Sequence, residues 1–221
     1  MSATVFDELN RALARLPRAT AGALRALRRG YSRRLAPQSA PEVLRLALRL
    51  VAAGGIERRF VAYELVHHHR GALAGLRASD VVRLGRGLDG WGAVDCFACY
   101  VAGPAWREGR LSDATIRGWA RSRDRWWRRA ALVSTVPLNS RARGGSGDPI
   151  RTLAVCRLLV ADRDDMVVKA MSWALRELAK RDAPAARRFL AEQGDALAAR
   201  VVREVRNKLT TGRKNPPRRR P

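Results

Sequence analysis

DDMVVKAMSWALRELAK, residues 164–180, is the stretch of sequence that decides the fold. It begins with aspartates and ends beside basic residues, the charges that stabilise the two ends of a helix. At about 100° per residue, apolar side chains share one face, and a tryptophan shares the opposite face with basic side chains. The apolar face holds Val167, Met171, Ala174 and Leu178, and the opposite face holds Lys169, Trp173, Arg176 and Lys180. The residues alone leave Trp173 two roles: packing against a second layer of helices, or contacting nucleic acid.

Helical spacing of apolar residues continues along the chain, and no segment shows the period of two that marks strands joined by hairpins. About a dozen helices of roughly 10 to 17 residues, joined by short turns, indicate stacked helix pairs rather than a globular bundle. The pairs recur about every 35 to 45 residues, as in degenerate HEAT-like repeats. The sequence therefore predicts an all-α solenoid with a concave face.

Two segments interrupt this pattern. NSRARGGSG, residues 139–147, is rich in glycine and arginine and is predicted to be a flexible loop. Residues 210–221 form a basic tail with prolines, predicted to be disordered and to add nonspecific phosphate affinity. We therefore expect a single helical-repeat domain over residues 1–209, followed by this tail.

The composition is strongly basic. The chain of 221 residues carries 44 basic residues against 20 acidic ones, a formal net charge of +24. Arginine supplies nearly all of this charge, and guanidinium groups suit bidentate phosphate contacts. A genome of high GC content also raises arginine and alanine content, so mutational bias is an alternative explanation for part of the excess. The charge favours a polyanionic partner such as nucleic acid.

Secretory and membrane classes find no support in the sequence. The first residues lack the charged start and apolar run of a signal peptide, and no stretch approaches the roughly 20 apolar residues that span a bilayer. Three cysteines give no disulfide framework. A cytoplasmic location is expected.

Metal and nucleotide sites are also disfavoured. Cys96 and Cys99 form a CxxC pair, but a zinc site needs a second pair of ligands, and a thioredoxin-type pair should follow a strand. Residues 67–69 are three histidines at successive helical positions, about 100° apart, so their rings cannot converge on one ion. The glycine-rich loop lacks the Lys-Ser/Thr ending of a P-loop. We expect no metal and no cofactor.

WGAVD, residues 91–95, contains the strongest candidate for chemistry. Trp91 and Asp95 stand four positions apart, so they share one face of a helix. Asp95 is the only charged residue between Gly90 and Trp106. A carboxylate in such a helix is either buried with a partner, such as an arginine, or lines a cleft. Both alternatives stay open on the residues alone.

RWWRRAA, residues 125–131, is the clearest basic helix. Trp126, Ala130 and Val133 are predicted to form its packing stripe, and Arg125, Arg128 and Arg129 to project to another side. This basic side is either a solvated surface or a set of guanidinium groups that bind phosphates, one of them oriented by Asp95.

Three motifs together resemble the AlkD-like family of DNA alkylation-repair glycosylases, which are built from HEAT-like repeats. They are Trp91-x-x-x-Asp95, WWRRAA at residues 126–131 and KAMSWALRE at residues 169–177. Their order and spacing match the family, and the third motif is the most specific. The resemblance covers residues 40 to 209.

The resemblance implies a right-handed α-solenoid of HEAT-like helix pairs that grips duplex DNA in its concave cleft and excises cationic N3- and N7-alkylpurines without a metal. Asp95 matches the catalytic carboxylate of the family. Trp91 and Trp173 match tryptophans that line the lesion nucleotide, and Arg129 matches an arginine that holds a backbone phosphate. Gly92 departs from the family, which often has an acid directly after the first tryptophan. The further candidates for DNA contact are Arg125, Arg128, Lys169 and Arg176.

The implied chemistry is physically coherent. A cationic base is already a good leaving group, so it need not be protonated. Positive charge develops on the deoxyribose as the glycosidic bond breaks, and a nearby carboxylate stabilises that charge and positions water, while tryptophan faces favour the cationic sugar.

The leading hypothesis is a monofunctional alkylpurine-DNA glycosylase that acts as a monomer on double-stranded DNA containing alkylated bases, with no membrane partner. It predicts that Trp91, Asp95, Arg129 and Trp173 converge on one concave surface. One alternative is a noncatalytic HEAT-like-repeat protein that binds DNA or structured RNA through its basic face, since the fold alone does not guarantee catalysis. Another is a protein-binding scaffold, which the isolated Asp95 and the tryptophan in a basic stripe both argue against.

Overall fold

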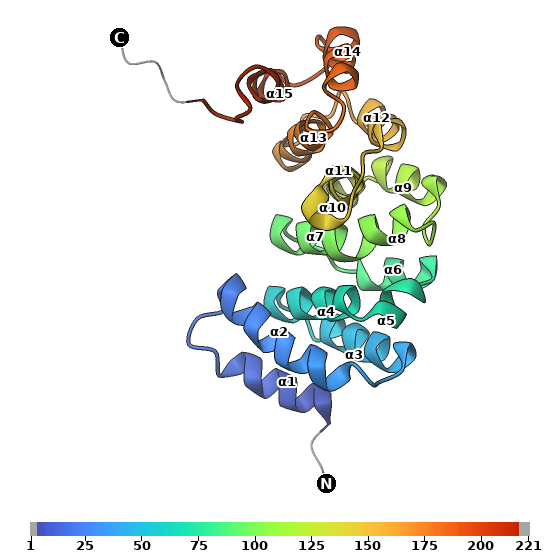
Figure 1. Ribbon diagram of the computed structural model, residues 1–221, viewed down its shortest axis with the longest axis vertical. Coiled ribbons are helices and arrows are strands. Elements are labelled where there is room, and N and C mark those ends of the chain that lie inside the picture. The colour runs from blue at the N-terminus through green and yellow to red at the C-terminus, as the bar shows by residue number, and fades with distance from the viewer. Residues whose placement is uncertain (1–3, 217–221) are drawn as a thin grey trace. The chain divides into compact units, whose positions relative to one another are not determined.

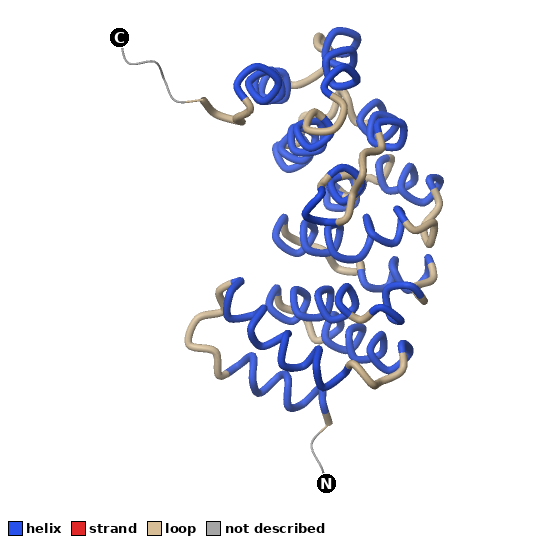
Figure 2. Tube along the Cα trace, in the orientation of Figure 1, coloured by secondary structure: helices blue, strands red, loops and turns tan. Residues whose placement is uncertain are grey.

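The computed structural model describes residues 4–216, and every regular element in that range is a helix (Figures 1 and 2). The predicted all-α class is confirmed. No helix within the described range is long and apolar enough to cross a membrane.

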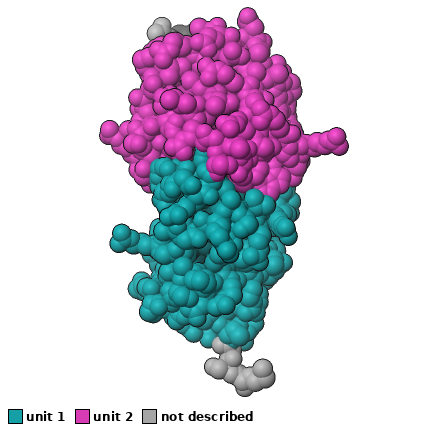
Figure 3. Space-filling model, turned by 90° about the vertical axis from the view of Figure 1, so that its right-hand side faces the viewer, with its two compact units in different colours: residues 1–111 teal, residues 112–221 magenta. Residues whose placement is uncertain are grey.

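Contacts within the chain divide it into two compact units, Met1–Leu111 and Ser112–Pro221 (Figure 3). Each unit has its own buried core. The single repeat domain over residues 1–209, the solenoid and its right hand stay predictions.

The first unit is organised around α4, Ile56–His68, in which every residue from Arg59 to Val66 is buried. Helices α2, α3 and α7 all pack against it, so even its polar side chains face protein. The helices of this unit are α1 Val5–Ala14, α2 Ala21–Leu35, α3 Ala40–Ala52, α4, α5 Arg70–Ala74, α6 Ala78–Leu84, α7 Trp91–Phe97 and α8 Gly103–Arg107. The site residues of this unit therefore rest on a central helix that is fixed on several sides.

The helix that begins at Trp91 changes its winding partway along. A π-helical segment, Ala98–Ala102, joins α7 to α8. Pro104 accounts for part of this, because it has no N–H to donate to the carbonyl of Tyr100 four residues earlier. The Nδ1 atom of His67 lies 3.0 Å from that carbonyl oxygen and, when it carries a proton, donates to it. A wider turn thus follows directly after the helix that carries Asp95.

The second unit is organised around α13, Asp165–Leu178, against which α10 and α15 pack. All four residues of its predicted apolar face are at most 2% exposed, which confirms the periodicity argument. The helices of this unit are α9 Asp113–Ala120, α10 Arg125–Val133, α11 Val136–Asn139, α12 Pro149–Leu158, α13, α14 Ala183–Gln193 and α15 Ala199–Thr211.

The loop over residues 139–147, predicted to be flexible, is held by hydrogen bonds. The N–H of Gly147 donates to the Leu138 carbonyl at 2.9 Å, and Arg181 Nε donates to the Asn139 carbonyl at 2.8 Å. A Cβ added to Gly145 would lie 2.4 Å from the Pro137 carbonyl oxygen, so only glycine permits this close approach. Gly145 thus permits close packing, whereas Gly144 and Gly147 have φ angles of 79° and 112°, in the region that favours glycine.

The start of the predicted tail is ordered. Helix α15 continues to Thr211 and ends at Gly212, whose φ of 72° lies in the left-handed region that favours glycine. The Lys214 Nζ atom lies 3.5 Å from a carboxylate oxygen of Glu204. Residues 217–221 of the predicted tail lie outside the described residues.

Candidate functional site

Trp91 and Asp95 lie one turn apart on α7, as their spacing predicts. The Trp91 side chain is 61% exposed, whereas large apolar side chains in this protein are mostly buried. Asp95 is partly exposed. Asp95 is thus not fully buried in the core, and its role stays a prediction.

A cavity of about 630 Å³ borders Trp91. Two glycine-rich turns, one before α4 and one before α7, form its walls together with Arg59. Gly92 also lines it, and a Cβ added there would lie 3.6 Å from Ile56 Cδ1, an ordinary contact. The missing side chain at position 92 therefore leaves the space beside Trp91 open.

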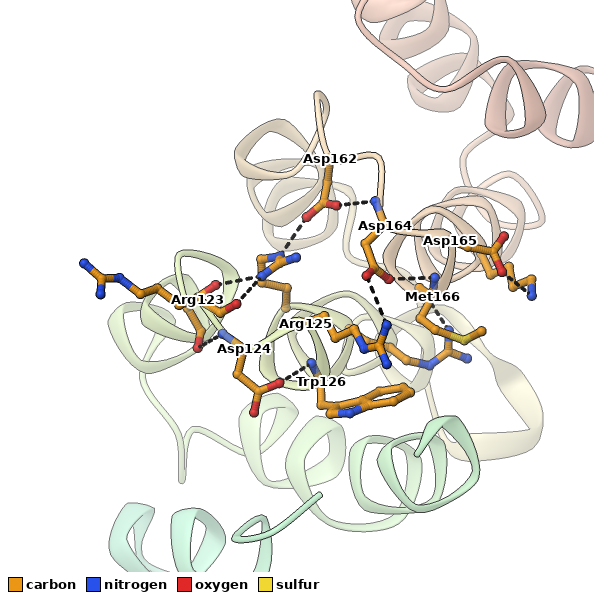
Figure 4. Close-up of polar contacts among 12 residues, drawn as sticks. Arg123, Asp124, Arg125, Trp126, Asp162, Asp164, Asp165 and Met166 are labelled. Carbon is orange, nitrogen blue, oxygen red and sulfur yellow. Dashed lines mark hydrogen bonds and ion pairs between the residues drawn. The ribbon is translucent and has the colours of Figure 1, made fainter. Parts of the chain in front are cut away.

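Arginines of α10 bind the residues that begin α13 (Figure 4). The Arg128 Nε atom donates to Asp162 Oδ2 at 2.7 Å, and Arg125 Nη1 lies 3.5 Å from Asp164 Oδ2. Asp164 is also the N-cap of α13, since its Oδ1 accepts the Met166 N–H at 2.9 Å. The two basic motifs found in the sequence are therefore joined by a shared set of ion pairs and caps.

Arg129 departs from the prediction that it projects away from the packing stripe. It is 5% exposed, and its Nη1 atom donates to the Met166 carbonyl at 2.5 Å. Arg128 has a side chain only 20% exposed, and its Nη1 atom also donates to two carbonyls of the preceding turn. Of the three arginines, only Arg125 is largely exposed, at 52% of its side chain. Buried guanidinium groups are tolerated here because carbonyl and carboxylate oxygens accept their hydrogens.

Trp173 lies on α13 between Lys169 and Arg176 in sequence, and all three are partly exposed. Lys169 Nζ lies 2.5 Å from Asp165 Oδ2, and Arg176 Nε donates to Ser172 Oγ at 3.1 Å. Burial lowers the pKa of Arg176 from its ordinary value. The basic stripe thus keeps an accessible edge while its inner atoms are bonded within the unit.

Glu204, on α15, joins this helix to α13. It is 3% exposed and accepts hydrogen bonds from Ser172 Oγ at 2.6 Å and Arg200 Nε at 3.0 Å. Burial by itself raises its pKa, but the hydrogen bonds from Ser172 and Arg200 and the charge of Lys214 hold the pKa below its ordinary value of 4.5. The charged carboxylate of Glu204 therefore helps to hold α15 against α13.

A pH dependence of stability follows from Glu204. Because its pKa is lower in the folded state, its contribution is fully present above the ordinary value of 4.5 and is lost as pH falls through the folded value. We expect Glu204→Gln to lower the melting temperature near neutral pH and to make its fall between about pH 5 and 3 shallower than that of the wild type. Glu192→Gln, which removes an exposed carboxylate paired at 3.5 Å, is the control. Parallel melting curves for wild type and Glu204→Gln across this range would contradict the prediction.

Two residues not singled out in the sequence support the segment that precedes Trp91: Arg59 donates to carbonyls of the turn, and Tyr63 donates to the carbonyl of Leu84, which ends α6. Their spacing of four on α4 was the available signal, but it does not reveal that their partners are backbone carbonyls of another segment. Within residues 4–216, no cluster of three or more His, Cys, Asp and Glu side chains could hold a metal ion.

The predicted site residues are divided between the two units. Trp91 and Asp95 belong to the first, and Arg129 and Trp173 belong to the second. Their convergence on one surface stays a prediction.

Comparison with known families places most of the chain. A family model described as DNA alkylation repair enzyme matches residues 19–209, which include every candidate site residue. The match also takes in α2, which precedes the three motifs. No curated protein matches the chain. The extent of the family match shows that this chain belongs to the DNA alkylation repair enzyme family.

Proposed function

We propose that the protein is a monofunctional glycosylase that hydrolyses the N-glycosidic bond of cationic N3- and N7-alkylpurines in duplex DNA. The observation that carries this proposal is the partly exposed carboxylate of Asp95, one helical turn after the exposed Trp91. No other charged residue lies between Gly90 and Trp106. Membership in a family of DNA alkylation repair enzymes supports the substrate class.

Asp95 is assigned the catalytic role. The bond between the sugar carbon and the base nitrogen breaks with its electron pair going to the base, which leaves as a neutral purine. The deoxyribose becomes cationic, and the Asp95 carboxylate stabilises this charge and positions the water that attacks the sugar carbon. The water then loses a proton to the solvent, which gives the abasic sugar. This route needs no metal or cofactor, because the leaving group already carries its positive charge.

Trp91 and Trp173 are assigned to the lesion nucleotide. Their indole faces favour the cationic sugar and base through cation–π attraction. Arg129 is assigned to a backbone phosphate because its motif, WWRRAA, resembles that of the family. The exposed edges of Arg125, Lys169 and Arg176 are assigned to neighbouring phosphates, whereas the bonds of Arg128 suit it to bracing this surface. We propose that the protein acts as a monomer in the cytoplasm.

The test is release of 7-methylguanine by the purified full chain from methylated duplex DNA, measured by chromatography of the free base. Duplex with no alkylated base is the substrate control. Release from the methylated duplex alone is expected. If the protein binds duplex DNA with steep salt dependence but releases no base, the noncatalytic DNA-binding alternative replaces the enzyme.

A further inference from the structure

The connection between α6 and α7, residues 85–90, determines where Trp91 lies. Trp91 is the first residue of α7, and the N-cap before it, Gly90, has no side chain to cap the helix. The indole is 61% exposed, so packing around the ring does not hold it. The position of Trp91 therefore depends on what holds the backbone of this connection.

Arg59 holds that backbone from α4. It is 8% exposed, and its Nη2 atom donates to the carbonyl oxygens of Arg86 at 2.8 Å and Gly87 at 2.9 Å. Its Nη1 atom donates to the Tyr63 hydroxyl oxygen at 3.0 Å. Among residues 4–216, no carboxylate lies within ion-pair distance of Arg59. Its guanidinium thus binds two backbone carbonyls of the connection and the Tyr63 hydroxyl, not a carboxylate.

Tyr63 extends the same anchor to the neighbouring helices. Its hydroxyl donates to the carbonyl of Leu84, the last residue of α6, at 3.0 Å. Its ring is fully buried and lies 5.7 Å, between centroids, from the ring of Phe97 on α7. Burial raises the pKa of Tyr63 to about 12, so the hydroxyl keeps its proton at neutral pH. Tyr63 thereby contacts both the start of the connection and the helix of Asp95.

Gly87 makes the approach of Arg59 possible. Its φ of +64° lies in the left-handed region that side chains disfavour. A Cβ at this position would lie 3.1 Å from Arg59 Nη2. The turn at Gly87 therefore leaves room for the guanidinium of Arg59. The single amino group of a lysine cannot replace the three hydrogen bonds that Arg59 makes.

We propose that Arg59 and Tyr63 are positioning residues for catalysis, which hold the 85–90 connection so that Trp91 meets the lesion nucleotide. This inference rests on the proposed function for its effect on catalysis. The holding of the connection is a separate step that does not depend on any activity.

The first experiment measures that holding step by hydrogen exchange of the full chain, followed by mass spectrometry. In Arg59→Lys and Tyr63→Phe, we expect exchange of amides in residues 85–91 to accelerate about tenfold. Arg28→Lys is the matched control, since Arg28 is also 8% exposed in the same unit but binds Glu64 instead. Exchange that rises equally in Arg28→Lys, or that rises evenly over the first unit, overturns the inference.

The second experiment measures base release. We expect Arg59→Lys to lower kcat about 100-fold, with KM within about threefold of wild type, because a misplaced contact impairs the reacting geometry more than binding. A double-mutant cycle identifies the route: in a Trp91→Ala background, Arg59→Lys should add less than about a twofold loss. A full additional loss in that background overturns the assignment. If the wild type releases no base, the proposed function fails, and the exchange experiment still decides whether Arg59 holds the connection.

Discussion

Asp95→Asn is expected to abolish release of 7-methylguanine from methylated duplex DNA while leaving affinity for that duplex nearly unchanged. Asparagine has the same shape but no negative charge, so it cannot stabilise the positive charge that develops on the sugar. Preorganised electrostatic groups of this kind contribute about 10² to 10³-fold or more to rate. We expect a loss of at least about 10³-fold in the single-turnover rate.

The binding measurement separates this loss from misfolding. Affinity for methylated duplex, measured by fluorescence anisotropy at fixed salt, should stay within about threefold of wild type, since phosphate contacts dominate binding. Glu108→Gln is the charge-matched control: it removes an exposed carboxylate of the same unit. Undiminished release by Asp95→Asn would exclude Asp95 as the catalytic carboxylate and would leave it a structural role.

Glu64→Gln is expected to lower the free energy of unfolding far more than Glu108→Gln, which removes an exposed carboxylate. Glu64 is 1% exposed, and its two carboxylate oxygens accept from Arg25 Nε at 3.0 Å and Arg28 Nε at 2.9 Å. Arg28 is itself buried, so removing the carboxylate charge leaves an uncompensated cation in the core. Breaking one partner of a buried pair lowers the free energy of unfolding by about 3 to 5 kcal/mol. Urea denaturation followed by circular dichroism measures it.

A compensating variant tests the cause. Replacing both partners with apolar residues, Glu64→Leu with Arg28→Met, should recover most of the lost stability, because no buried charge remains. Glu108→Gln should change the free energy of unfolding by less than about 1 kcal/mol, as removal of an exposed ion pair does. If Glu64→Gln unfolds at the same urea concentration as Glu108→Gln, the buried pair does not carry this stability.

The helices and their buried faces could be read from the sequence, as α13 illustrates. Its caps and its apolar repeat are local properties, and the structure buries the four residues that the repeat selects. Trp91 and Asp95 likewise lie on one helix, as their spacing required. The winding of the segment after α7 was missed, because a π-helical turn depends on Pro104 and on a histidine from another helix.

The sequence did not show which arginines of α10 are exposed and which are buried. Helical periodicity treats Arg125, Arg128 and Arg129 as one basic side, but they differ from largely exposed to 5% exposed. What separates them is the position of oxygen atoms from the segment that begins α13. An arginine is equally suited to a phosphate and to a carbonyl, so its sequence context does not choose between them.

The sequence by itself determined that this protein is helical, which faces of its helices are buried and which repair family it belongs to. These properties follow from the period of apolar residues and from short motifs, both of which are local. Only the tertiary structure decided that Arg59 and Tyr63 hold the turn before Trp91, that Glu64 pairs with the buried Arg28 and that Glu204 accepts a hydrogen bond from Ser172. These bonds join segments distant in sequence through backbone carbonyls and single charges, and no pattern of residue types marks such partners before the chain has folded.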